Sequence, residues 1–313
     1  MAELDRPALV AHARDSIARG SRSFAVASKL FDKPTRERAW LLYAWCRKCD
    51  DLADGQDHGG GMSVIDDAAD RLNYLTGMTE AAWSGVPTGD PAFDGFGLVA
   101  RECGIPRGYA DDLIAGFALD AEEWRPRSEH DLYRYCYHVA GAVGCMMAII
   151  MGMDPEDDET LDRATDLGLA FQLANIARDI EEDDAAGRCY LPMEWLAEFD
   201  IPPGQHMKPP FRPALVTMAK RLADASERYE ASARVGAARL PYHSRWAVLA
   251  AAGIYGDIAR EVRRRGAHAW DHRVFTSKAD KLRWVARAAK QARGTPEQAS
   301  RNGLWDRAMM PRG

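Results

Sequence analysis

Two acidic segments, about 125 residues apart, hold the side chains of this chain that are best suited to chemistry. The first reads CRKCDDLAD from Cys46 to Asp54, and the second reads QLANIARDIEED from Gln172 to Asp183. In both segments, side chains with oxygen ligands recur every four residues, a spacing that places them on one face of an α-helix. Such a row of like charges repels itself, and facing an apolar interior it is costly unless cations neutralise it.

The oxygen ligands form one row in each segment. Asp50 and Asp54 make up the first row, and Asn175, Asp179 and Asp183 make up the second. Carboxylate and amide oxygens are hard ligands suited to Mg²⁺, which keeps several waters and commonly shares phosphate oxygens. Two such rows on facing helices predict one pocket in which several Mg²⁺ or Mn²⁺ ions bridge a diphosphate and make it a better leaving group.

Basic side chains are interleaved with the acidic ones. Arg47 and Arg178 have the fork geometry that binds phosphate oxygens, so we expect them to contact the diphosphate. Asp51 is rotated by about 100° from Asp50 on a regular helix. We therefore expect Asp51 to support the site through Arg47, four residues earlier, rather than to bind metal.

The elements that must position these rows are helices. Apolar periodicity predicts helices over Arg36 to Asp54 and over Leu161 to Ile180. Three further long helical patterns cover Ala214 to Ala237, Ser244 to Arg265 and Lys278 to Ala292. Because no convincing run of alternating, β-branched residues accompanies them, we predict an all-α bundle of one domain over residues 1–313. Its core would cover about residues 12–292, with a flexible C-terminal tail over 293–313.

Three shorter segments complete the expected organisation. The apolar run from Val139 to Met153 is too short to span a bilayer comfortably, so we predict a buried helix. Its Gly, Ala and Met residues either line a tunnel or allow close helix packing. The acidic run from Asp154 to Glu159 suits the N-terminus of the helix that follows. The proline-rich stretch from Asp200 to Pro213 cannot be regular helix.

Composition and charge restrict the function further. The chain has 313 residues, 47% of them hydrophobic and 28% charged, and a net charge of −6, which argues against nucleic acid as a partner. From Arg260 to Gly313, however, 14 Lys and Arg stand against 5 Asp and Glu. This basic segment is either a solvated helical face or a surface that rests on anionic membrane. The N-terminus lacks the apolar core of a signal peptide, so we expect a cytoplasmic protein with at most peripheral membrane contact.

The residues around the two rows resemble one family. Collinear matches are SRSFAVASKLF (Ser21 to Phe31), LLYAWCRKCDDLAD (Leu41 to Asp54), YCYHVAGAVGCMMAIIMG (Tyr135 to Gly152) and LGLAFQLANIARDIEEDDAAGRCYLP (Leu167 to Pro192). A weaker match covers Ile254 to Phe275. The chain is similar over roughly residues 12–290 to the squalene/phytoene synthases, and within them to bacterial phytoene synthases. The resemblance implies the isoprenoid-synthase type of helical bundle, with a central cavity.

The resemblance also implies a reaction and a set of site residues. The reaction is head-to-head condensation of two geranylgeranyl diphosphates to phytoene, through a cyclopropyl prephytoene diphosphate and without NADPH. Aspartates of the two rows would be catalytic, and Tyr43, Tyr135 and Tyr255 would lie near the reacting centre, where their rings could stabilise carbocations. The residues implied for substrate binding are Ser21, Arg22, Ser23, Phe24, Arg47, Gln172, Arg178 and, more weakly, Arg273, with Phe24 as packing or tunnel lining.

Three alternatives stay open at this point. A class I terpene cyclase shares the spacing of the second row, although the flanking SRSF, YCYHVAG and GRCYLP segments favour the head-to-head family. A C30 enzyme would use farnesyl diphosphate instead, because tunnel depth depends on a few side chains that sequence does not place. A non-catalytic helical relative would be expected to lack several of the aspartates, yet all are present.

Overall fold

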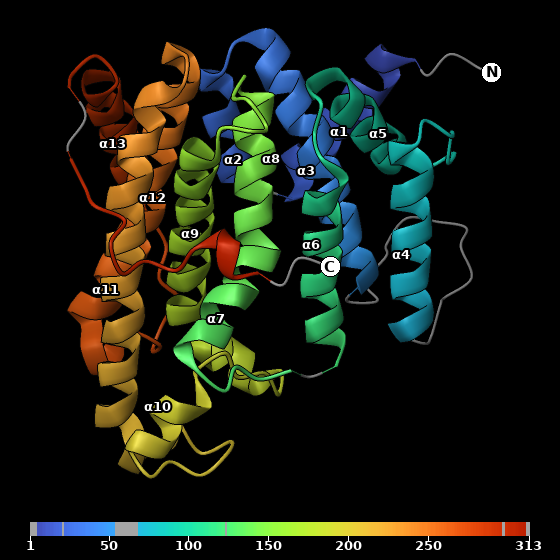
Figure 1. The fold of residues 1–313 in the computed structure, drawn as a ribbon. Helices are drawn as coiled ribbons and strands as arrows, with labels where there is room; N and C mark the ends of the chain where they lie inside the picture. Colours follow the sequence, from blue (N-terminus) through green and yellow to red (C-terminus); the bar gives the residue numbers. More distant parts are fainter. Residues whose placement is uncertain (1–4, 21, 54–67, 123, 296–297, 311–313) are drawn as a thin grey trace.

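The computed structural model describes residues 5–20, 22–53, 68–122, 124–295 and 298–310, without the side chains of residues 22 and 23. Every regular element in this part of the chain is helical, as predicted, and the long helices run side by side around a buried apolar core (Figure 1). None of these helices is long and apolar enough to cross a membrane.

The two helices that carry the acidic rows are α3 (Lys33–Ala53) and α9 (Asp158–Ala185). The α3 helix begins three residues before the predicted range and is described to Ala53, one residue short of its predicted end. The α9 helix extends beyond the predicted range at both ends. The α9 helix begins after Asp157, whose side chain accepts a hydrogen bond from the backbone N–H of Thr160. Because this cap is followed by Asp158 and Glu159 in the first turn, the acidic run stabilises the helix N-terminus as predicted.

The other long predicted helices are also present, within a residue or two of their expected ends. The bundle contains α1 (Arg6–Gly20), α2 (Arg22–Ala27), α4 (Ala68–Trp83), α5 (Pro91–Cys103), α6 (Arg107–Ala121), α7 (Glu129–Cys136), α8 (Ala142–Ile150), α10 (Met193–Glu198), α11 (Arg212–Gly236), α12 (Tyr242–Arg265) and α13 (Lys278–Gln291). The proline-rich stretch is irregular apart from a short 3₁₀ turn over Pro209–Phe211, and α11 starts at its last two residues.

Helix α9 lies at the centre of the packing, against α8, α11 and α12. Its approach to α8 is close because glycines face backbone on both sides. A Cβ on Gly168 would lie 2.4 Å from the carbonyl oxygen of Ala140, and one on Gly144 would lie 2.4 Å from that of Ala164. Small residues thus give the close packing that was one of the two interpretations of this apolar run.

The apolar run is not one regular helix, which corrects the prediction. A wide π-helical turn over Tyr137–Gly141 precedes α8. Two consecutive side chains of this turn reach Asp112 of α6: the Tyr137 hydroxyl donates to its carboxylate at 2.6 Å, and His138 Nδ1 lies 2.9 Å from its carbonyl oxygen. Consecutive residues of a regular α-helix point about 100° apart, so meeting one partner requires local rewinding.

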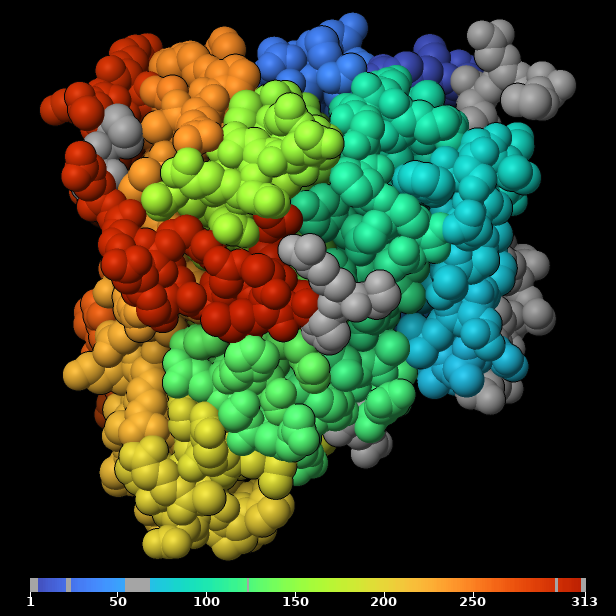
Figure 2. Space-filling model, viewed as in Figure 1, coloured from blue at the N-terminus to red at the C-terminus, as the bar shows by residue number. Residues whose placement is uncertain are grey.

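The C-terminal segment 298–310 lies against the bundle, so the prediction of a flexible tail is wrong for these residues. It runs across the helices on one face of the molecule (Figures 1 and 2). Trp305 is only 4% exposed, and its backbone N–H donates to the Tyr229 hydroxyl at 3.1 Å. Arg301 binds both carboxylate oxygens of Asp166, at 2.8 and 3.0 Å, and Asp166 is fully buried on α9. These long-range contacts anchor a segment whose local sequence has no helical pattern.

Candidate functional site

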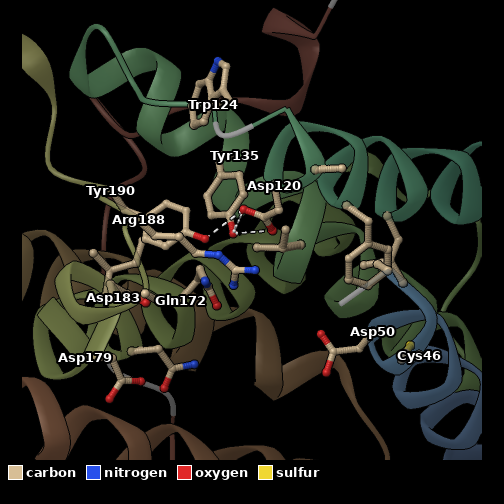
Figure 3. A pocket seen from close by; sticks show the side chains of 18 of the residues that line it. Cys46, Asp50, Asp120, Trp124, Tyr135, Gln172, Asp179, Asp183, Arg188 and Tyr190 are labelled. Carbon is tan, nitrogen blue, oxygen red and sulfur yellow. Dashed lines mark hydrogen bonds between the residues drawn. The ribbon is translucent and has the colours of Figure 1, made fainter. Parts of the chain in front are cut away.

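A polar cavity of about 820 Å³ lies between α3 and α9. Asp50 lines one side of it, while Asp179 and Asp183 line the other (Figure 3). Asn175, the third member of the α9 row, lines the cavity as well. Gln172, one turn before Asn175, also faces the cavity. The fold therefore brings Asp50 of the first predicted row and all three members of the second row to one cavity.

Arginines neutralise the row on α9. Both Nε and Nη2 of Arg178 donate to the carboxylate of Asp179, at 2.7 and 2.5 Å. Arg273 reaches the same carboxylate at 3.0 Å from the chain beyond α12, and it also binds Glu182 at 3.1 Å. Burial raises the pKa of Asp183 to about 7, and the nearby Asp179 carboxylate adds to the shift. The row is thus a place where further negative charge is unfavourable and a cation is favourable.

On α3, Arg47 holds two aspartates. Its guanidinium lies 3.0 Å from an oxygen of Asp50 and 2.5 Å from one of Asp51. The predicted pairing of Asp51 with Arg47 is therefore present, although Arg47 also binds Asp50. Asp54, the second member of this row, lies outside the described residues.

The predicted phosphate-contacting segment before α3 is described only in part. Ser21 and the side chains of Arg22 and Ser23 lie outside what the structure describes. Phe24 is described, and its ring lies 5.6 Å from that of Tyr43. Within the described residues, no three His, Cys, Asp or Glu side chains lie close enough together to hold a metal ion. The predicted ligand set also includes Asn175, which is none of these four residue types, and Asp54, which lies outside the described residues.

An aromatic group beside the rows shares one carboxylate. Tyr135 and Tyr190 both donate to Asp120, at 3.0 and 2.8 Å, and their rings stack with centroids 4.9 Å apart (Figure 3). Trp124 stacks on the other side of Tyr135 at 5.6 Å. Burial, followed by the charge of Asp120, raises the pKa of Tyr135 well above its usual range, so this phenol stays protonated. The result is a wall of aromatic rings with a fixed carboxylate at the cavity.

Sequence reasoning predicted Tyr135 but missed the rest of this group. Tyr190 lies in the GRCYLP segment that carried the resemblance, so that signal could have found it. Asp120 lies near the end of an apolar helix, α6, without a repeating partner, so no spacing distinguishes it. Three arginines that line the cavity were also missed, namely Arg71, Arg125 and Arg188.

A second, apolar cavity of about 450 Å³ adjoins the polar one. Phe24, Tyr43 and Tyr255 line it, and the ring of Tyr255 stacks on Phe171 at 4.2 Å. Met147, Met151 and small residues of the apolar run line it as well, so the run lines a cavity in addition to packing closely against α9. Six residues line both cavities, so the polar and the apolar spaces meet there: Tyr43, Cys46, Val139, Val143, Gln172 and Asn175.

Comparison with known proteins identifies the family that has this arrangement. The sequence model of the squalene/phytoene synthase family matches residues 17–280. The chain belongs to the squalene/phytoene synthase family. The resemblance seen in the motifs is thereby confirmed, and the protein is a prenyl-diphosphate-processing enzyme of the transferase type.

Relatives within the squalene/phytoene synthase family match over nearly the full chain. A phytoene synthase from Pseudescherichia vulneris is 45% identical, covering 97% of this chain and 99% of its own length. A 15-cis-phytoene synthase from Pantoea ananas is 44% identical, covering 98% of this chain and 100% of its own length. Among solved structures, a dehydrosqualene synthase is 26% identical with a TM-score of 0.80, covering 91% of this chain and 97% of its own. These similarities confirm the predicted fold class.

Proposed function

We propose that the protein is a 15-cis-phytoene synthase, which condenses two geranylgeranyl diphosphates head to head in carotenoid biosynthesis. The observation that carries the proposal is the junction of the two cavities: a polar space lined by both oxygen-ligand rows opens onto an apolar space. A prenyl diphosphate has the same two parts, a charged head and a hydrocarbon tail. Identities of 44–45% over nearly the whole length to phytoene synthases favour the C20 substrate.

The reaction requires two ionisations. In the first, one diphosphate leaves with its bonding electrons, the resulting allylic cation is attacked by the double bond of the second substrate, and loss of a proton closes a cyclopropane ring. In the second, the remaining diphosphate leaves, the ring rearranges, and loss of another proton gives the central double bond. The products are phytoene, two diphosphates and two protons, so no reductant is consumed.

The chemistry of the two rows fits divalent metal. Asp50, Asn175, Asp179 and Asp183 offer hard oxygen donors. The pKa of Asp183 is raised by burial and then by the charge of Asp179, and a cation would offset both effects. These residues, together with Asp54, would hold Mg²⁺ or Mn²⁺. Bound metal would supply charge stabilisation of the departing diphosphate.

The arginines have a role that does not depend on metal. Arg178 does not line the cavity, but it is held against Asp179, which does. Arg47 lines the cavity and is fixed by Asp50 and Asp51. Preorganised guanidiniums bind phosphate oxygens without losing further side-chain freedom. Arg273 is half-exposed, so it can exchange Asp179 for a diphosphate oxygen. Gln172, Ser21, Arg22 and Ser23 would complete the diphosphate contacts.

The aromatic residues would act on the cation that each ionisation leaves behind. Tyr43 and Tyr255 line the apolar cavity near its junction and would offer ring faces to the cation. Tyr135 stacks on Trp124 and Tyr190 and is held by Asp120, so it would shape the wall beside the reacting centre. An aromatic face attracts a cation, and a desolvated one does so by about 2 kcal/mol. Asp120 holds the Tyr135 hydroxyl, so it is a positioning residue.

Incubation of the purified protein with Mg²⁺ or Mn²⁺ and either C20 or C15 diphosphate, followed by hydrocarbon analysis, tests the proposal. We expect a C40 hydrocarbon with the phytoene chromophore from the C20 substrate without NADPH. Consumption of farnesyl diphosphate alone would replace the proposal with the C30 alternative. A cyclic product from a single substrate would favour a terpene cyclase.

We also propose that the outer face of α13 rests on anionic membrane, which would bring the lipid-soluble product to a bilayer. The exposed side chains of α13 include Lys278, Arg287 and Lys290. Two large apolar side chains are also exposed, Phe275 (76%) just before the helix and Leu282 (70%) within it. Basic residues beside exposed apolar ones are typical of interfacial helices.

Sedimentation with vesicles of zwitterionic lipid, with and without anionic lipid, tests this surface. Each basic side chain near an anionic membrane contributes about 1 kcal/mol, so Arg287→Glu with Lys290→Glu should weaken binding to anionic vesicles at least tenfold. Arg14→Glu with Lys220→Glu, on exposed residues of α1 and α11, gives the same charge change elsewhere. Equal binding to both vesicle types, or equal loss in the two double variants, would contradict the proposal.

A further inference from the structure

One charged side chain lies in the wall of the apolar cavity. Among the described residues that line this cavity, Arg163 of α9 is the one that carries a charge. It lies twelve positions before Asn175, about 18 Å along the helix at 1.5 Å per residue. Asn175 is at the junction with the polar cavity. Arg163 therefore lies far down the apolar cavity from the diphosphate end, at a distance comparable with an extended chain of four isoprene units.

The guanidinium of Arg163 is tied in place. Its Nη1 donates to the backbone carbonyl and the hydroxyl of Ser232, both at 3.2 Å, and to the carbonyl of Ala299 at 3.4 Å. Ala299 belongs to the C-terminal segment that crosses the bundle (Figure 2). The Arg163 side chain is only 14% exposed. Its stem thus lies in the apolar wall while its head reaches polar groups beneath the C-terminal segment.

Two further features describe how Arg163 lies in the wall. Its Nε is buried and makes no hydrogen bond to the described residues, and the nearest ion-pair contact, to Glu159, is 4.0 Å long. Gly236 makes room for the stem, since a Cβ there would lie 2.5 Å from the Cβ of Arg163.

We propose that Arg163 is a chain-length stop, a side chain that ends the space for the isoprenoid tail, and that the C-terminal segment holds it in place. This inference rests on the proposed function and deepens it, because it names what limits the substrate. A tail one isoprene unit longer would have to displace the guanidinium from Ser232 and Ala299, leaving buried polar groups unpaired. Neutral residues of the wall could yield by changing rotamer at much lower cost.

The test measures binding of unreactive thio-diphosphate analogues with C15, C20 and C25 tails to the full-length protein in Mg²⁺, by calorimetric titration. For Arg163→Ala we expect the C25 analogue to gain at least about tenfold in affinity relative to the C20 analogue. Arg163→Met keeps the volume of the stem but removes the charge, and a flexible thioether can move aside. The Arg163→Met variant should also gain affinity for the C25 analogue relative to the C20 analogue. It provides the test if the alanine variant does not fold.

Arg228→Met is the matched control. Arg228 also donates to a carbonyl of the C-terminal segment, that of Gly303 at 3.2 Å, but it does not line the cavity. We expect its C25-to-C20 ratio to equal that of the unmodified protein. An equal gain in the control would assign the effect to a loosened C-terminal segment and overturn the role of Arg163. An unchanged ratio in folded Arg163 variants, or loss of C20 binding in both, would overturn it as well.

The same titrations separate this inference from the proposed function. If the unmodified protein prefers the C15 analogue and makes a C30 hydrocarbon, the phytoene assignment fails. The stop would still be supported if Arg163→Ala then moves the preference to the next longer tail. If the unmodified protein prefers C20 and the variants do as well, the phytoene assignment stands and the stop fails.

Discussion

At the scale of single residues, the candidate site is a set of carboxylates that are already shared with guanidiniums. Asp179 accepts from Arg178 and Arg273, while Asp50 accepts from Arg47. A diphosphate and its cations would therefore enter a network with both signs of charge in place, exchanging partners rather than creating isolated ions. This arrangement gives each aspartate a distinct expected effect on mutation.

Asp179→Asn and Asp50→Asn should each lower product formation by at least about 1,000-fold, since each removes an anionic donor worth several kcal/mol of transition-state stabilisation. Asp51→Asn is the matched control, because Asp51 contacts Arg47 and is not an expected metal ligand. Substitution of a supporting residue of this kind typically lowers activity 10- to 100-fold. Hydrocarbon yield measures activity, and circular dichroism checks that the helices persist. Near-normal activity of either asparagine variant at a proposed ligand would refute the two-row arrangement.

Tyr135 gives a prediction about pH. Because burial and then Asp120 raise its pKa well above the usual value, the phenol should remain a hydrogen-bond donor throughout the pH range in which the protein is folded. A raised folded-state pKa means that this tyrosine contributes stability up to about pH 10 and loses it as the pH rises further. The tyrosinate absorbance of the unmodified protein minus that of Tyr135→Phe should therefore stay flat to about pH 10. A titration step below about pH 10 would show that the Tyr135 hydroxyl is not buried against Asp120.

The residues of the site differ in how far sequence could predict them. The α9 row follows from spacing alone, because three ligands at intervals of four share a helix face. Arg273 reaches Asp179 from 94 positions away, so only the family resemblance indicated it. Asp120 joins Tyr135 and Tyr190 across separations of 15 and 70 residues. Such convergence depends on how helices pack, and no local pattern records it.

At the scale of elements, apolar periodicity predicted which segments are helical, but it did not predict where a helix changes its winding. Apolar spacing predicted the ends of α11, α12 and α13 within two residues. It predicted the existence of α3 and α9 but placed the start of both, and the end of α9, three to five residues inside the observed bounds. Sequence spacing does not predict the π-helical turn before α8, because the contacts of that turn are made with Asp112 on another helix. The apolar run also contains glycine for a reason that its own sequence does not show: a Cβ on Gly144 would lie 2.4 Å from the carbonyl oxygen of Ala164 in α9.

Glycine substitutions should separate these packing roles. Gly168→Ala should destabilise the protein by roughly 1–3 kcal/mol or more, because its Cβ would lie 2.4 Å from a backbone oxygen that cannot turn aside. Gly77→Ala, in the exposed middle of α4, meets nothing within 4 Å and should instead stabilise by about 0.5–1 kcal/mol. Urea unfolding of both variants measures the two free energies. A Gly168→Ala variant as stable as Gly77→Ala would mean that α9 and the π-helical turn before α8 are not in close contact.

At the scale of the whole molecule, the C-terminal segment joins parts that are far apart in the chain. Its sequence predicts flexibility, since it has no apolar periodicity and several charged residues. The structure gives those charges partners that sequence could not reveal. Arg301 binds Asp166 and Asp162, and Arg307 binds Asp162 and the Tyr109 hydroxyl. The first half of α9 is thereby held by this segment, and the second half carries the oxygen-ligand row.

Arg301→Ala tests that anchor. Asp166 is fully buried, and burial already raises its pKa despite Arg301, so removing the guanidinium would leave a buried carboxylate without its cation. We expect a loss of about 3–5 kcal/mol in the free energy of unfolding, measured with urea. Arg283→Ala, which breaks an exposed pair with Asp280, should cost at most about 1 kcal/mol.

The loss of unfolding free energy in Arg301→Ala should also depend on pH and on whether residue 166 carries a charge. A carboxyl whose folded-state pKa is raised is most favourable when protonated, so the variant should lose stability as the pH rises from about 4, the unfolded value, through the raised one. The penalty of Arg301→Ala should accordingly be smaller near pH 5 than near pH 8. Adding Asp166→Asn should recover most of it, because the uncompensated charge is gone. A penalty independent of pH, unrelieved by the second substitution, would show that the ion pair is not what anchors the segment.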